Sequence, residues 1–202
     1  PPFLAACKRQ AAAHTPIWIM RQAGRYLPEY RALRAKHDFL TMVRTPELAV
    51  EVTLQPVRRF ALAAAILFSA ILTPLDGRGL GLEFHPAPVF TQPLRTPAAI
   101  DALVLPPPQE NAAHVFAAVA GLRAALPPET PLIGFAGAPF TLFCYLVEGH
   151  GSKGFFVAKS FLFSEPAALV RLLDKLGTET VAYLVALSAA AAPFLMIFDS
   201  WA

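Results

Sequence analysis

Short apolar segments that end in polar or turn-forming residues constrain the fold of this chain more than any other feature. They are residues 17–20, 64–69, 132–135 and 195–198. Between and around them lie stretches with helical character, which are residues 28–37, 46–62, 111–125 and 166–192. Apolar runs of this length fit strands buried on both faces, and their alternation with helices predicts βαβ units with a parallel sheet.

Two smaller features refine this pattern. Pro56 lies inside the second helical stretch, where it removes a backbone donor, so we expect a bend or a split there. Residues 82–90 indicate a loop with a small hairpin.

Right-handed crossovers place functional groups at the carboxyl ends of parallel strands, and the polar residues of this chain fall at those ends.

The composition indicates a folded protein that does not bind nucleic acid. Hydrophobic residues make up 55% of the chain, charged residues 15%, and the mean hydropathy is +0.49, which argues against disorder. The net charge of +3 comes from scattered basic residues without runs or interleaved aromatics, so no nucleic-acid partner is expected. No basic-then-apolar leader pattern opens the chain, and we expect a cytoplasmic location.

Cysteine spacing gives no support for a metal or a disulfide. Cys7 and Cys144 lie far apart, without a CxxC pattern or a nearby histidine pair. We therefore expect no zinc site, no disulfide framework and a reducing compartment.

Two uncharged stretches, residues 60–75 and 180–198, raise the alternative of a membrane protein. The first is short for a bilayer span. The second contains Pro193 between a helix-like half and a strand-like half, which fits a helix, a turn and a buried strand better than one span. The sequence thus favours a protein without membrane segments.

Residues 20–31 carry the most chemical information. They read Met-Arg-Gln-Ala-Gly-Arg-Tyr-Leu-Pro-Glu-Tyr-Arg, and they place Arg21 and Arg25 four residues apart directly after a predicted strand. A guanidinium group pairs with a carboxylate through two parallel hydrogen bonds and stays charged in a desolvated pocket. This segment suits a polycarboxylate ligand, and surface arginines at a helix start are the alternative.

The same segment resembles the signature of uroporphyrinogen decarboxylases. Further similar segments follow in the same order along nearly the whole chain, at residues 46–60, 65–69, 134–139, 145–153 and 197–201. The resemblance implies a (β/α)8 TIM-barrel fold of the α/β class. We expect the 202 residues to form a single, C-terminally truncated domain of roughly the first four βα units, because a closed barrel needs roughly 250 residues.

The resemblance also implies an activity. The family removes carbon dioxide from the four acetate arms of uroporphyrinogen III and yields coproporphyrinogen III in heme synthesis, without metal or organic cofactor. Arg21 and Arg25 would bind carboxylates or assist proton transfer, Gln22 would line the cleft, and Tyr145 and Ser200 would hydrogen-bond the substrate. Family members commonly form homodimers, so a homodimer is implied here.

One departure from the family pattern affects the chemistry directly. The strand motif of the family ends in Phe-Ser-Asp, whereas this chain reads Phe68-Ser69-Ala70. Alanine offers no acceptor to the pyrrole N–H groups and no counter-charge to a cationic ring, so we expect turnover to fall at least about tenfold to a hundredfold. Asp76, six residues further on, is an alternative source of a carboxylate.

Two other functions stay open at this stage. A catalytically dead, tetrapyrrole-binding protein would keep Arg21 and Arg25 in use without turnover. A cobalamin-linked methyltransferase of the same broad superfamily is disfavoured by residues 20–31 and by the lack of a zinc-ligand cluster in the sequence.

Overall fold

The computed structural model describes residues 1–77 and 79–200, and their contacts divide the chain into two compact units. Unit 1 consists of Pro1–Ala70, Ala113–Phe135 and Ala186–Met196. Unit 2 consists of Ile71–Ala112, Ala136–Val185 and the residues from Ile197 onwards.

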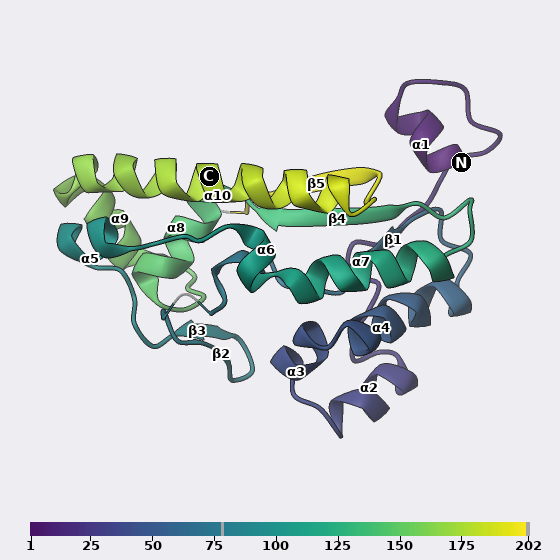
Figure 1. The fold of residues 1–202 in the computed structure, drawn as a ribbon, viewed down its shortest axis with the longest axis horizontal. Helices are drawn as coiled ribbons and strands as arrows, with labels where there is room; N and C mark the ends of the chain where they lie inside the picture. Colours follow the sequence, from purple (N-terminus) through teal and green to yellow (C-terminus); the bar gives the residue numbers. More distant parts are fainter. Residues whose placement is uncertain (78, 201–202) are drawn as a thin grey trace. The chain divides into compact units, whose positions relative to one another are not determined.

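The main sheet has the strand order β1-β4-β5, with β1 at Ala65–Ile66, β4 at Leu132–Gly137 and β5 at Phe194–Phe198 (Figure 1). β1 and β4 are parallel, and Ala65 and Ile66 pair with Leu132 and Ile133. Every residue of β4 is buried, as expected for a central strand. The predicted α/β class with a parallel sheet is therefore confirmed.

Several helices belong to unit 1. They are α1 (Pro2–Cys7), α2 (Pro28–Arg34), α3 (Phe39–Arg44), α4 (Pro46–Arg59) and α7 (Ala113–Ala125). α4 lies against α7, α2, α3 and β1 (Figure 1). A small core of Leu27, Tyr30, Met42 and Val52 joins α2, α3 and α4.

Unit 2 contains a hairpin and several helices. The hairpin pairs β2 (Leu82–Phe84) with β3 (Pro88–Phe90) in antiparallel register, which confirms the predicted hairpin. Its helices are the 3-10 turn η1 (Thr73–Leu75), α5 (Pro97–Ala102), α6 (Pro108–Asn111), α8 (Pro139–Glu148) and α9 (Phe156–Ser164). The long α10 (Pro166–Ala189) begins in unit 2 and ends in unit 1.

The prediction of a strand at residues 17–20 is wrong. The segment is extended but forms no ladder, and Ile17, Ile19 and Met20 are 67%, 45% and 53% exposed. One backbone bond joins it to the neighbouring chain, from the N–H of Ala63 to the carbonyl of Ile17 at 2.8 Å. Beyond that point the side chain of Gln22 occupies the next backbone groups of that neighbour, so the ladder does not continue.

Of the bend or split predicted at Pro56, the split is also wrong. α4 runs through Pro56 and ends three residues later at Arg59. The proline removes one donor near the helix end, and the N–H of Phe60 donates to the carbonyl of Pro56 at 2.9 Å to close the last turn. The stretch 111–125, in contrast, is divided between α6 and α7 at Ala112.

The two uncharged stretches do not form membrane helices. Within residues 1–77 and 79–200, no helix combines the length and the apolar character that a bilayer crossing requires.

Candidate functional site

Arg21 and Arg25 lie on the turn that leads from residues 17–20 into α2, which we call the arginine turn. Both side chains are exposed, and neither guanidinium forms a hydrogen bond or ion pair with another residue in the described part of the chain. The turn itself is ordered by Arg31, whose Nη1 donates to the carbonyl of Arg25 at 2.8 Å. The two cations thus stand on a fixed backbone with their donors available to an anion.

Gln22, between them, is buried to 1% exposure and uses both polar atoms of its side chain. Its Nε2 donates to the carbonyl of Ala64 at 2.7 Å, and its Oε1 accepts from the N–H of Ile66 at 3.0 Å. The carbonyl of Gln22 also accepts a hydrogen bond from the hydroxyl of Tyr26. The amide thereby fastens the arginine turn to β1, and a substrate-lining role for Gln22 stays a prediction.

Ala70 follows β1 and is half-buried. The chain just before it is fixed by Thr53 of α4, whose hydroxyl donates to the carbonyl of Ala49 at 2.8 Å and accepts from the N–H of Phe68 at 2.9 Å. Position 70 is therefore held on a defined backbone and carries a methyl group.

Asp76, the alternative carboxylate, is buried in unit 2 with 8% exposure. Its Oδ1 accepts from the N–H of Gly77 at 2.9 Å, and its carbonyl accepts from Asn111 Nδ2 at 3.2 Å. These bonds give Asp76 a structural place in its own loop.

Tyr145 projects from α8 in unit 2 and is half-buried. Its ring packs edge-to-face on Phe155 with centroids 6.1 Å apart, and a β-carbon at position 151 would lie 3.7 Å from the ring. Burial, and secondarily the Cys144 thiol, raise the pKa of Tyr145 above its ordinary value of 10.0. The phenol is consequently protonated at neutral pH and can donate a hydrogen bond.

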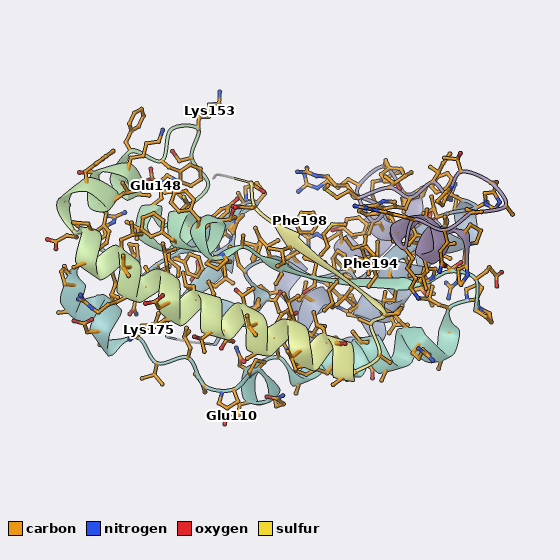
Figure 2. All side chains as sticks on the ribbon, turned by 90° about the horizontal axis from the view of Figure 1, so that it is seen from above. Glu110, Glu148, Lys153, Lys175, Phe194 and Phe198 are labelled. Atoms are coloured by element: carbon orange, nitrogen blue, oxygen red, sulfur yellow. The ribbon has the colours of Figure 1, made fainter. Side chains whose placement is uncertain are left out.

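Glu148 holds the loop that surrounds Tyr145. Its side chain is 5% exposed, and its Oε2 accepts from the N–H groups of Val157 and Ala158 at 3.0 and 3.1 Å in the first turn of α9 (Figure 2). A carboxylate at a helix N-terminus satisfies backbone donors that have no partner within the helix. Gly149 begins the loop with a φ of +91°, a conformation that glycine adopts without strain.

Ser200 follows the end of β5 and is exposed. Its N–H donates to the hydroxyl of Thr141 in α8 at 2.9 Å. The same hydroxyl donates to Oδ1 of Asp199 at 2.9 Å.

The predicted site residues thus fall into two local groups. Arg21, Gln22, Arg25 and position 70 belong to unit 1, and Tyr145 and Ser200 belong to unit 2. The sequence interpretation missed Thr141, and it predicted no helix at α8, where Pro139 at the first helical position was the available signal. No group of three or more histidine, cysteine, aspartate or glutamate side chains that could hold a metal occurs among residues 1–77 and 79–200.

Comparison with known proteins assigns the chain to a family. The sequence model of the family described as "Uroporphyrinogen decarboxylase (URO-D)" matches residues 1–202. A protein named uroporphyrinogen decarboxylase from Alkalilimnicola ehrlichii is 54% identical over 202 residues, which cover 98% of this chain and 55% of that protein. A protein of the same name from Roseiflexus sp. is 48% identical, with 99% of this chain and 58% of that protein covered. The chain therefore spans a little over half the length of these relatives.

A solved structure shares the fold. A methyltransferase from Methanosarcina mazei superposes with a TM-score of 0.77 at 19% identity, over 97% of this chain and 57% of that chain. This likeness concerns the fold alone. The family has a TIM-barrel fold, and this chain, with its parallel sheet and about half the length of its relatives, represents an incomplete barrel. On the full-length family match and the identities near one half, the chain belongs to the uroporphyrinogen decarboxylase family.

Proposed function

We propose that this chain provides substrate-binding and proton-transfer groups for the cofactor-free decarboxylation of uroporphyrinogen III to coproporphyrinogen III. The observation that carries the proposal is the arginine turn. Two exposed guanidinium groups without partners among the described residues stand on a backbone fixed by a buried glutamine, in a chain whose relatives bear the name of this activity. Arg21 and Arg25 would hold the carboxylates of the tetrapyrrole through paired, charge-assisted hydrogen bonds.

The remaining residues would act on the macrocycle and its arms. Decarboxylation of an acetate arm leaves electrons that a protonated pyrrole ring can accept, so a site that favours a cationic ring lowers the barrier. The protonated phenol of Tyr145 and the hydroxyl of Ser200 would donate hydrogen bonds to the substrate. Ala70 supplies no acceptor to the pyrrole N–H groups, and the turnover of this chain would accordingly be low.

A second candidate function follows from that same substitution. A protein that binds uroporphyrinogen without converting it would retain the arginine turn and could dispense with a carboxylate at position 70. Release of carbon dioxide distinguishes the two functions, because binding alone produces none.

The binding step is tested directly with uroporphyrin, the stable and fluorescent oxidised form of the substrate. Arg21→Ala and Arg25→Ala should each weaken binding about tenfold or more, since a hydrogen bond to a charged group contributes about 1.5–3 kcal/mol. Arg123→Ala, which removes an exposed arginine on α7, is the matched control and should leave the affinity unchanged. Equal affinities in all four proteins would remove the carboxylate-binding assignment.

The proposal extends to the cellular setting. We propose a cytoplasmic homodimer without metal or organic cofactor. Sedimentation of the purified protein over a range of concentrations tests the dimer, and a single species with the mass of one chain throughout would contradict it.

A further inference from the structure

The hydroxyl group of Thr141 bridges two consecutive residues that follow β5. Thr141 is 0% exposed and lies in the first turn of α8. It donates to Oδ1 of Asp199 at 2.9 Å and accepts from the N–H of Ser200 at 2.9 Å. A threonine hydroxyl has one proton, so the bond to Asp199 orients its lone pairs toward Ser200.

A third bond joins the same two segments. The N–H of Ala138, directly before α8, donates to the carbonyl of Phe198 at 2.8 Å. Figure 2 marks Phe198 at the end of β5, just before the two residues that Thr141 holds. Three successive residues, from Phe198 to Ser200, are thereby bonded to the start of one helix.

We infer that Thr141 is a positioning residue that fixes the backbone of Ser200 so that the Ser200 hydroxyl faces the substrate. The inference rests on the proposed function, in which Ser200 donates to the tetrapyrrole. Ser200 is exposed and lies two residues beyond the end of β5, where the backbone has no ladder bond of its own to hold it. The buried hydroxyl supplies that constraint, and a misplacement of a binding group by a fraction of an ångström is enough to weaken its contact.

The side chain at position 141 allows a sharp test. Thr141→Val has nearly the same shape and removes both hydrogen bonds, whereas Thr141→Ser retains the hydroxyl. Thr178→Val is the matched control, because Thr178 is an exposed threonine on α10 of the same unit. Asp199→Ala weakens the same linkage to a smaller extent, since it removes only the acceptor of the Thr141 hydroxyl by a change at the exposed surface.

Binding of uroporphyrin to the 202-residue chain gives the functional readout. We expect Thr141→Val and Ser200→Ala each to weaken binding about tenfold, and the double variant to be no weaker than either alone, because both remove one contact. Thr141→Ser should bind like the unchanged chain, and Asp199→Ala should lose about threefold. Additive losses in the double variant would overturn the inference while leaving the proposed function intact. A loss of affinity in Ser200→Ala with none in Thr141→Val would have the same meaning.

A measurement without ligand distinguishes the positioning role of Thr141 from the proposed function. Hydrogen exchange at the Ser200 amide should accelerate at least about tenfold in Thr141→Val and less in Asp199→Ala. It should stay slow in Thr141→Ser and in Thr178→Val. Unchanged exchange in Thr141→Val would refute the positioning role even where uroporphyrin binds. Accelerated exchange in a chain that binds no uroporphyrin would instead show that the proposed function fails, and with it the substrate-facing role of Ser200.

Discussion

Gln22 accepts a hydrogen bond from the backbone N–H of Ile66, a residue 44 positions further along the chain, at 3.0 Å. Together with the bond from its Nε2 to Ala64, this makes the side-chain amide a substitute for a neighbouring strand at the edge of β1. The arrangement joins the arginine turn to the strand that leads to position 70, so the two parts of the candidate site in unit 1 share one anchor.

Replacing Gln22 should therefore destabilise unit 1. Gln22→Ala leaves a buried donor at Ile66 and a buried acceptor at Ala64 without partners, and we expect the free energy of unfolding to fall by about 2 kcal/mol. Urea denaturation followed by circular dichroism measures the change. Gln10→Ala, at an exposed glutamine of the same unit, is the control, and an equal effect of both changes would contradict the anchoring role.

Lys175 should stabilise unit 2 through the end of α5. It projects from α10 (Figure 2), and its Nζ donates to the carbonyls of Ile100, Asp101 and Leu103 at 2.8, 3.0 and 2.8 Å. Lys175→Met keeps the aliphatic stem and leaves these helix-terminal carbonyls without the ammonium, so we expect a loss of about 1–2 kcal/mol in unfolding free energy. Thermal or urea melts should show no such loss for Lys159→Met on the surface of α9.

The two thiols should differ in reactivity. Cys7 is exposed and Cys144 is buried, and burial raises the pKa of Cys144 from 9.0 to about 11. At about pH 8 a chromogenic disulfide reagent should label Cys7 rapidly and Cys144 only after unfolding, because the thiolate is the reactive form. Cys7→Ser should abolish the fast phase, and a fast phase that survives this change would show that Cys144 is accessible.

The raised pKa of Cys144 makes the free energy of unfolding depend on pH. The unfolded thiol ionises near 9.0 and the folded thiol near 11, so the unfolded state loses its proton first as the pH rises. The contribution of the Cys144 thiol to the free energy of unfolding is fully present below the pKa of the unfolded state and declines as the pH rises toward the pKa of the folded state. Cys144→Ala should flatten the fall in the melting temperature over that alkaline interval, and an unaltered slope would contradict the assignment.

If the proposed function is correct, a carboxylate at position 70 should raise turnover. In a chimera that joins this chain to the remaining C-terminal part of the Alkalilimnicola ehrlichii relative, Ala70→Asp should raise coproporphyrinogen formation at least about tenfold, because it returns an acceptor and a counter-charge to the ring. Ala61→Asp, which adds one carboxylate at an exposed position before β1, is the control. No gain from Ala70→Asp would show that position 70 is not the main defect.

Periodicity and turn signals predicted much of the architecture. The apolar runs at β4 and β5 and the long helices α4 and α10 follow directly from the sequence, because each has a strong and continuous pattern. α3 and α5 were not predicted, since both are six residues long, although Asp38 and Thr96 cap them through bonds to the N–H groups of Thr41 and Ala99. Short helices carry too few residues for a period to be visible, and the cap is then their main signal.

The candidate site was harder to predict than the fold. The residue types in the arginine turn indicated their chemistry, since guanidinium groups need no partner within the chain to suit an anion. The places of Gln22 and Thr141 depend on bonds between residues that lie 42 to 59 positions apart, and no local pattern contains that information. A side chain that replaces a strand neighbour also explains why an apolar segment with strand character, residues 17–20, forms no ladder.

The hydroxyl of Thr53 fixes the approach to position 70 through the N–H of Phe68, and this bond does not depend on the side chain at position 70. An aspartate at position 70 would therefore meet the same fixed backbone that now carries the alanine. Alanine and aspartate codons can differ by one base, so a single mutation could place a carboxylate on this backbone. By this measure the chain is one genetic step from a carboxylate at that position.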